Sequence, residues 1–295
     1  MLNFYIVDVF AVGKYTGNQL AVFTGDGVGG LSDREMQRIA KEMNYSETTF
    51  IISPEMRDGG YEVRIFTPAK ELPFAGHPTL GTAFILQQEI IQSLVDTVIL
   101  NLKVGQIPVS LYYQDAAVDV LWMRQKTPVF GQTFTVEQLA PVLNLEVDEI
   151  DPRFPIQDVS TGIPFIIVPL KNHAALKRSK LNKDKYFELI DQIEAKSILI
   201  FCPETYSTEN DLSVRVFTEY FGIPEDPATG SANGCLAGYL VKYSYFGSDL
   251  VDVRVEQGYE IGRPSLLLLK AGKNQEEIEV NVGGKVVMVA KGEFV

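Results

Sequence analysis

The sequence has few of the residues that bind metals or form disulfide bonds. Its 295 residues include two cysteines and two histidines. Cys202 and Cys235 both lie in apolar segments, which predicts reduced core residues rather than a disulfide bridge. His77 and His173 are far apart, and neither a Cys-x-x-Cys nor a His-x-x-x-His motif occurs. The sequence therefore predicts no metal site.

Basic clusters and long apolar segments are also missing. The net charge is −12 and no stretch is dominated by Lys or Arg, so we do not expect a nucleic acid as a partner. No run approaches the ~20 apolar residues of a membrane span. The first ten residues lack the basic n-region of a signal peptide and predict a strand. These absences lead us to expect a cytoplasmic protein with no membrane partner.

A long-range repeat stands out in what the sequence does contain. Arg64-Ile-Phe-Thr and Arg215-Val-Phe-Thr each precede a turn with an acid and a proline, and each turn leads to a glycine that opens an apolar helix, Gly76 or Gly230. The arginines are 151 positions apart (215 − 64) and the glycines 154 (230 − 76). Copies of about 150 residues have the size of domains, not of stacked repeats. The sequence therefore predicts an internal duplication.

The pattern of strands and helices predicts an α+β fold made of two similar halves. We expect domains at 1–127 and 128–283, related by a pseudo-twofold axis, with a C-terminal strand at about 284–295 completing the first. The apolar helices at 78–86 and 232–240 have little polar surface. Each should therefore be buried inside a strongly curved antiparallel sheet. The small residues that would let strands approach these helices are Gly81, Ala83, Gly234, Ala237 and Gly238.

Other segments carry local signals. Ser32 and Glu35 form a capping box that predicts a helix ending near Asn44. Four prolines punctuate residues 124–158, which predicts a connector between the halves with one short helix at 136–143. A further helix is expected at 183–194.

The helices that begin at Gly76 and Gly230 are candidate anion sites. The first turn of a helix has unpaired backbone N–H groups and the positive end of the helix dipole, which favour a carboxylate or phosphate. Ser231 adds a hydroxyl group at the second helix. The alternative is that both are ordinary capped core helices. The repeat favours one anion site shared between the halves.

Glu47 and His77 are candidate proton-transfer residues. Glu47 follows a predicted helix, precedes an apolar strand and has hydroxyl residues on both sides, including Ser46. A half-buried carboxyl group among hydroxyls is suited to proton transfer. His77 lies one residue after Gly76, on the first turn of its helix. The alternatives are a solvated loop acid and a histidine that only caps a helix.

Several motifs together give a resemblance to a known family. They are Gly17-Asn18, Ser46-Glu47-Thr48, Ala75-Gly76-His77-Pro78-Thr79, Glu225-Asp226-Pro227-Ala228-Thr229-Gly230-Ser231-Ala232, and Glu256-Gln257-Gly258 through Gly262-Arg263-Pro264-Ser265. In order and spacing the chain resembles the phenazine-biosynthesis PhzF-like isomerases. The resemblance implies a diaminopimelate-epimerase-like fold, in which two similar domains close over a cleft, and a homodimer.

The resemblance also implies roles for individual residues. The family's general acid/base matches Glu47, and its other catalytic residues match His77 and Asp226. The residues expected to bind substrate are Asn18, Ser46, Gly76, Thr229, Gly230 and Ser231. The implied function is a cofactor-independent isomerase that moves a proton between carbons of a small carboxylate.

Three alternatives remain beside this function. The first is a protein that binds small carboxylates without catalysis. The second is a racemase or epimerase of the same fold; its thiol-pair form is disfavoured because Ala75 and Thr229 precede the helix-opening glycines, and Cys235 lies a full turn inside its helix. The third is a nucleotide-binding protein, which is disfavoured because neither helix start has the glycine spacing of a nucleotide motif.

Overall fold

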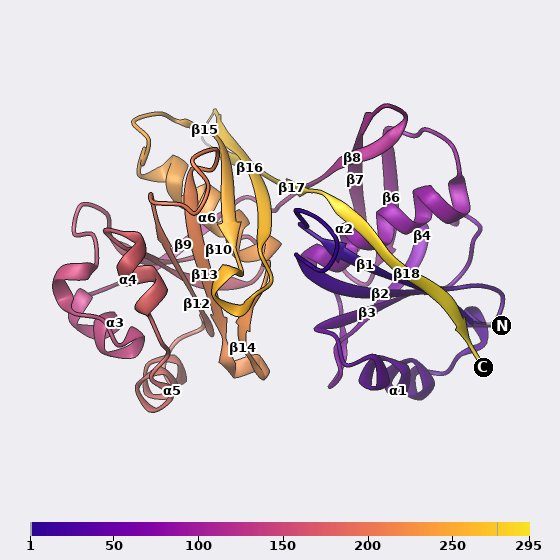
Figure 1. Cartoon of the computed structure of the whole chain (residues 1–295), viewed down its shortest axis with the longest axis horizontal. Helices are drawn as coiled ribbons and strands as arrows, with labels where there is room; N and C mark the ends of the chain where they lie inside the picture. Colours follow the sequence, from indigo (N-terminus) through magenta and orange to yellow (C-terminus); the bar gives the residue numbers. More distant parts are fainter. Residues whose placement is uncertain (1, 276) are drawn as a thin grey trace. The chain divides into compact units, whose positions relative to one another are not determined.

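The computed structural model describes residues 2–275 and 277–295. The chain divides into two compact units. Unit 1 is Met1–Met123 with Gly283–Val295, and unit 2 is Arg124–Val282. In Figure 1, unit 1 is indigo to purple with the yellow C-terminal strand, and unit 2 is magenta to orange. The predicted domains, 1–127 completed by about 284–295 and 128–283, stay a prediction.

Unit 1 contains two α-helices and a sheet to which the last strand of the chain returns. Its elements are β1 (Leu2–Val9), β2 (Asn18–Thr24), α1 (Asp33–Met43), β3 (Glu47–Ile51), β4 (Tyr61–Phe66), β5 (Glu71–Leu72), α2 (Gly76–Ile85), β6 (Thr97–Leu102), β7 (Gly105–Gln114), β8 (Ala117–Arg124) and β18 (Val286–Phe294). A π-helical turn, Leu86–Ile91, extends α2. Strand β18 pairs antiparallel with β1, so the two ends of the chain lie side by side.

Unit 2 repeats this order of elements with two additional helices. Its elements are β9 (Val129–Phe134), α3 (Val136–Leu143), β10 (Ile156–Ser160), β11 (Pro164–Pro169), α4 (His173–Arg178), α5 (Lys183–Asp191), β12 (Ser197–Cys202), β13 (Leu212–Thr218), β14 (Ile223–Asp226), α6 (Gly230–Lys242), β15 (Leu250–Gln257), β16 (Ser265–Asn274) and β17 (Glu277–Gly284). The helix predicted at 136–143 is confirmed as α3, and the helix predicted at 183–194 as the shorter α5.

Residues 124–158 are more than the predicted connector. Strand β9 lies within them and pairs antiparallel with β10. Helix α3 also lies there and contributes Leu139 and Leu143 to the hydrophobic core of unit 2. The prolines misled the prediction because Pro128 directly precedes β9 and does not interrupt it.

The strand pairings of the two units correspond one to one. The antiparallel pairs β1–β2, β3–β4 and β6–β7 of unit 1 match β10–β11, β12–β13 and β15–β16 of unit 2. The parallel pairs β2–β3 and β4–β6 match β11–β12 and β13–β15. The sheets are therefore mixed rather than wholly antiparallel. Helices α1 and α2 in unit 1, and α5 and α6 in unit 2, lie in the crossover connections that these parallel neighbours require.

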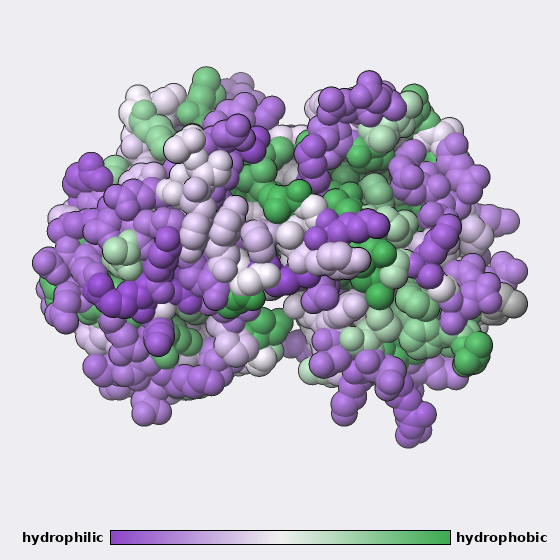
Figure 2. Space-filling model, in the orientation of Figure 1, coloured by the Kyte–Doolittle hydropathy of each residue, from purple (hydrophilic) through white to green (hydrophobic). Residues whose placement is uncertain are grey.

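Each unit is an α+β fold with a curved sheet around one apolar helix, as predicted. Every residue of α2 from His77 to Ile85 is buried, and α2 contacts β1, β2, β3, β6, β7 and β18. Helix α6 is similarly buried and contacts β10, β11, β15 and β16. By contrast, α1 turns a hydrophilic side outward, which Figure 2 shows in purple at the lower edge of unit 1.

Small residues allow strands and connecting chain to approach the two central helices, as predicted. A Cβ atom added to Gly81 would lie 2.6 Å from Cδ2 of Leu20. One added to Gly238 would lie 2.5 Å from Cγ of Pro128. Both separations are far shorter than normal van der Waals contact, so a larger side chain would displace the neighbouring chain.

The capping box at α1 is confirmed. The Ser32 side chain accepts from the backbone N–H of Glu35, while the backbone N–H of Ser32 donates to Oε2 of Glu35 at 2.8 Å. A second capping box, at Thr135 and Gln138, begins α3. Within the described residues, no helix is long and apolar enough to cross a membrane.

Candidate active site

Three of the predicted site residues lie at one edge of the unit 1 sheet. Strands β2 and β3 are parallel with Leu20 opposite Glu47, so Asn18, the first residue of β2, and Ser46, just before β3, lie at the same edge. Asn18 is buried, whereas Ser46 and Glu47 are half-buried. Glu47 reaches this edge because α1 ends at Asn44, whose left-handed backbone reverses the chain into β3.

His77 faces Glu47 from the first turn of α2. His77 Nε2 lies 3.4 Å from Glu47 Oε2, and the two side chains are 7% and 15% exposed. Burial lowers the pKa of His77 to about 3, and a hydrogen bond to the backbone of Gln19 only partly offsets this. His77 is therefore a neutral imidazole at neutral pH.

The hydrogen bonding of His77 fixes which nitrogen carries its proton. His77 Nε2 makes no hydrogen bond within the described part of the chain, so the bond to Gln19 belongs to Nδ1. Because that bond raises the pKa of His77, Nδ1–H donates to the Gln19 carbonyl. Nε2 is then an acceptor that faces the Glu47 carboxyl group. Such a pair can hold one proton between the two side chains.

Among the residues that the structure describes, no side chain caps the N-terminus of α2. Its N-cap residue is Ala75, which has no acceptor, and the Thr79 hydroxyl bonds backward to the Ala75 carbonyl at 2.7 Å. Helix α6 begins in the same way: no side chain caps it within the described residues, and Asn233 Nδ2 donates to the Thr229 carbonyl at 3.1 Å. Both first turns therefore keep N–H groups for an anion.

The predicted residues of unit 2 gather at the start of α6. Asp226 is the last residue of β14 and is 8% exposed. The Thr229 hydroxyl donates to Asp226 Oδ2. Gly230 is buried and Ser231 half-buried at the first turn of the helix. Of the nine predicted site residues, the structure thus places Asn18, Ser46, Glu47, Gly76 and His77 in unit 1 and Asp226, Thr229, Gly230 and Ser231 in unit 2.

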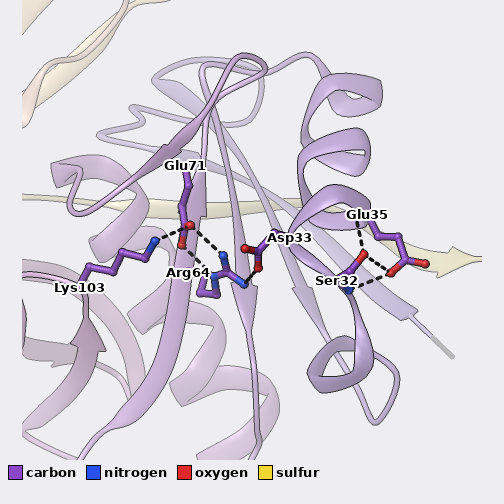
Figure 3. A network of polar contacts seen from close by, with 6 residues as sticks. All are labelled: Ser32, Asp33, Glu35, Arg64, Glu71 and Lys103. Atoms are coloured by element: carbon purple, nitrogen blue, oxygen red, sulfur yellow. Dashed lines mark hydrogen bonds and ion pairs between the residues drawn. The ribbon is translucent and has the colours of Figure 1, made fainter.

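An arginine–glutamate pair holds the turn before each helix. In unit 1, Arg64 makes two hydrogen bonds to Glu71, each 2.8 Å long, and a third to Asp33. Figure 3 shows Lys103 on the other side of the same carboxylate. In unit 2, Arg215 pairs with Glu225 at 2.9 and 2.7 Å and also donates to the Ser179 carbonyl.

Sequence reasoning gave these pairs no role. The available signal was the repeated arginine and the acid in the turn that follows it. Glu225 directly precedes Asp226, and Glu71 precedes Leu72 at the equivalent place. Bidentate pairing to arginine therefore fixes both turns in one geometry.

The cysteines are buried core residues, as predicted. Burial raises the pKa of Cys202 and of Cys235 to about 12, so neither forms a thiolate near neutral pH. Among the described residues, no group of three His, Cys, Asp or Glu side chains could hold a metal ion.

Known proteins resemble the chain over its whole length. The family model described as phenazine biosynthesis-like protein matches residues 7–292. A trans-2,3-dihydro-3-hydroxyanthranilate isomerase of Pseudomonas aeruginosa is 35% identical over 99% of each chain. A crystal structure of a PhzF-family protein of Bacillus anthracis matches with a TM-score of 0.90 at 30% identity, covering 100% of this chain and 99% of that one.

A more distant likeness concerns the fold alone. A probable proline racemase of Agrobacterium radiobacter matches with a TM-score of 0.64 at 10% identity, over 100% of this chain and 93% of its own. The fold is thus one that racemases share. The family match, the identity to the Pseudomonas enzyme and the crystal structure agree, and the chain belongs to the phenazine biosynthesis-like PhzF family of isomerases.

Proposed function

We propose that this isomerase moves a proton between carbons of a small carboxylate, with Glu47 as the general acid and base. The observation that carries the proposal is the pair of half-buried Glu47 and buried His77, with 3.4 Å between Oε2 and Nε2. A carboxyl group in reach of a neutral imidazole can both take and return a proton. Water must be excluded from the site while the carbanion-like state exists.

The reaction needs no external oxidant or reductant. A C–H bond of the substrate breaks, its proton goes to Glu47, and the electron pair is delocalised into the conjugated system next to the carboxylate. The Glu47 O–H bond then breaks and a C–H bond forms at another carbon. While Glu47 holds the transferred proton, its O–H group donates a hydrogen bond to Nε2 of His77, because the other ring nitrogen, Nδ1, is held by Gln19.

The substrate carboxylate would bind at the helix starts. The donors that we assign are the N–H groups at Gly76 and Gly230 together with the Ser231 hydroxyl. Dipoles fixed in advance in this way stabilise developing negative charge, and removing one such donor commonly costs ~10²-fold in rate. Asp226 would orient an amino or hydroxyl group of the substrate, and Asn18 and Ser46 would contact the substrate beside Glu47.

The first substrate to test is the one named for the Pseudomonas relative. Trans-2,3-dihydro-3-hydroxyanthranilate carries a carboxylate, an amino group and a hydroxyl group on one ring, as its name states. These are the groups that the anion site and Asp226 would bind. A two-thiol racemisation is not favoured, because Ala75 and Thr229 stand at the helix starts and both thiols are buried.

Isotope exchange tests this proposal. Candidate carboxylates, beginning with trans-2,3-dihydro-3-hydroxyanthranilate, are incubated in D₂O with wild type, Glu47→Gln and the control Glu42→Gln, which removes an exposed acid on α1. We expect wild type and Glu42→Gln to convert the substrate with deuterium on the newly protonated carbon, and Glu47→Gln to lose exchange. Equal exchange by Glu47→Gln would contradict the role of Glu47. A ligand that binds and is recovered without deuterium would indicate a non-catalytic binder.

We also infer that the protein works in the cytoplasm as a homodimer without a cofactor, as the resemblance implies. Sedimentation equilibrium of the purified protein checks the dimer. A mass near that of one 32.8-kDa chain would contradict it.

A further inference from the structure

Gln257 lies beside Asp226 and has no role in the proposed chemistry. It is the last residue of β15, is 1% exposed, and bonds to three residues at the start of α6. Its Nε2 donates to the Asp226 carbonyl at 2.8 Å and to the Thr229 hydroxyl at 3.1 Å. Its Oε1 accepts from the Thr229 N–H at 3.2 Å and from Asn233 Nδ2 at 2.9 Å. Both ends of the amide are therefore used.

This network determines the direction of the Thr229 hydroxyl. A hydroxyl group has one proton to donate, and Oγ1 of Thr229 already accepts from Gln257. Its proton therefore points away from Gln257, toward Asp226 Oδ2. Donation to one carboxylate oxygen restrains rotation of the Asp226 side chain. The amide of Gln257 thus acts on the Asp226 carboxylate through Thr229.

Unit 1 shows that the helix start does not need this network. The equivalent strand β6 ends in Leu102, the equivalent strand β5 ends in Leu72, and the N-cap of α2 is Ala75. Helix α2, like α6, begins from an N-cap residue with an extended backbone, and it does so with Leu102 in place of the buried amide of Gln257. Burying polar groups costs free energy unless every group is satisfied. A polar network that the duplicated scaffold does without therefore points to function.

We propose that Gln257 is a positioning residue, which directs the Thr229 hydroxyl so that the Asp226 carboxylate is held in one orientation. The inference rests on the proposed function in that Asp226 is taken to contact substrate. It assigns the Thr229 side chain to orienting Asp226 rather than to binding the substrate, because its hydroxyl is engaged on both sides. Misplacing a catalytic group by about 1 Å can cost on the order of a hundredfold in rate.

The first experiment needs no substrate. Crystal structures are determined for wild type, Gln257→Leu and Thr229→Ala, which copy Leu102 and Ala75 of unit 1, and for Thr229→Ser, which keeps the hydroxyl. The matched control is Gln157→Leu, because Gln157 is also buried in unit 2 but bonds to Gly131 and Tyr243 near the other end of α6. We expect Asp226 to change or split its side-chain rotamer in Gln257→Leu and Thr229→Ala only. An unchanged Asp226 in both variants overturns the proposal.

The second experiment measures turnover of trans-2,3-dihydro-3-hydroxyanthranilate. We expect Gln257→Leu to lower kcat about ten- to a hundredfold with KM within about twofold, and Gln157→Leu to keep the wild-type kcat. In an Asp226→Asn background, Gln257→Leu should lower kcat no further, because the carboxylate that it positions is gone. If Gln257→Leu lowered kcat in the Asp226→Asn background as much as it does in wild type, Gln257 would act independently of the Asp226 carboxylate. That result would also overturn the proposal. Absence of wild-type turnover counts against the proposed function alone, because the crystal structures decide the positioning role.

Discussion

The two units of the molecule share one scaffold but differ where chemistry is expected. Strand β3 begins with Glu47 opposite Leu20 of β2, and the equivalent strand β12 begins with Ser197 opposite Phe165 of β11. Conversely, β14 ends with Asp226 where β5 ends with Leu72. At these two positions, each unit therefore has a carboxylate where the other has none.

What both units retain is equally informative. Each keeps an arginine–glutamate pair before the central helix, an uncapped helix start and a side chain that bonds back to the N-cap carbonyl. The arginine–glutamate pairs and the back-bonded N-cap carbonyls belong to the scaffold, whereas the two uncapped helix starts are the proposed donors to the substrate carboxylate. Features found in one unit, such as Glu47 and Asp226, are the candidates for catalysis. The following predictions test this separation, beginning with the largest effect.

The scaffold pairs should contribute unequally to stability. Arg215 and Glu225 are 8% and 9% exposed, whereas Arg64 and Glu71 are 20% and 16% exposed. We expect Arg215→Leu to lower the free energy of unfolding by about 3–5 kcal/mol, because it leaves a buried carboxylate without its partner. Arg64→Leu should cost about 1–2 kcal/mol, since Lys103 still neutralises Glu71. Urea unfolding followed by circular dichroism gives both values, and equal losses would contradict the burial argument.

The acid at the start of β3 should matter for turnover, and the serine at the start of β12 should not. Glu47→Asp keeps the charge but withdraws the carboxylate by one methylene group, so we expect kcat to fall about a hundredfold. Ser197 is 1% exposed, and its hydroxyl makes no hydrogen bond within the described chain. Ser197→Ala should therefore leave kcat unchanged and leave stability unchanged or slightly higher. A loss of turnover in Ser197→Ala would mean that the starts of both β3 and β12 take part in catalysis. It would contradict the assignment of catalysis to features found in one unit.

The sequence predicted the duplication because the repeated arginine, glycine and apolar helix are local patterns. The sequences around the two helix starts could be aligned with each other residue by residue. The strand at Glu47 could be predicted because the capping box before it marks a helix, and an apolar segment follows Glu47. The hydrogen bonds that Gln257 makes, and the parallel strand pairs, could not be predicted in this way. They depend on which strands become neighbours across the sheet, and Gln257 is 31 positions from Asp226. Hydrophobic periodicity identifies strands but does not identify which strands pair with each other.

The two histidines should differ in their effect on acid stability. The pKa of His77 falls to about 3 in the folded protein, so between pH 6.5 and pH 3 the unfolded chain binds a proton that the folded chain does not. The contribution of His77 to the free energy of unfolding is therefore constant above about pH 7. It declines as the pH falls, by about 2 kcal/mol between pH 7 and pH 5. His173 also has a lowered pKa but is only half-buried.

Substitution of each histidine separates its contribution to the pH dependence of stability from the contributions of other groups. His77→Gln should remove most of the decline between pH 7 and pH 5, and His173→Gln should remove a smaller part. Urea unfolding gives the free energy of unfolding of each variant at pH 7 and at pH 5. Comparing the change between the two pH values removes the effect that the substitution has on stability at pH 7. A His77→Gln variant with the wild-type decline would contradict the neutral, buried state of His77.

The smallest expected effect concerns the capping boxes that begin α1 in unit 1 and α3 in unit 2. Ser32 begins α1 and Thr135 begins α3, and each accepts a hydrogen bond from the third residue of its helix. Replacing either by alanine removes one such bond from an exposed helix end, so we expect a loss of about 1 kcal/mol in each case. Turnover should not change, because neither helix carries a proposed catalytic residue. A drop in kcat for Ser32→Ala alone would indicate that α1, which leads directly to Glu47, sets the position of that acid and is part of the catalytic difference between the units.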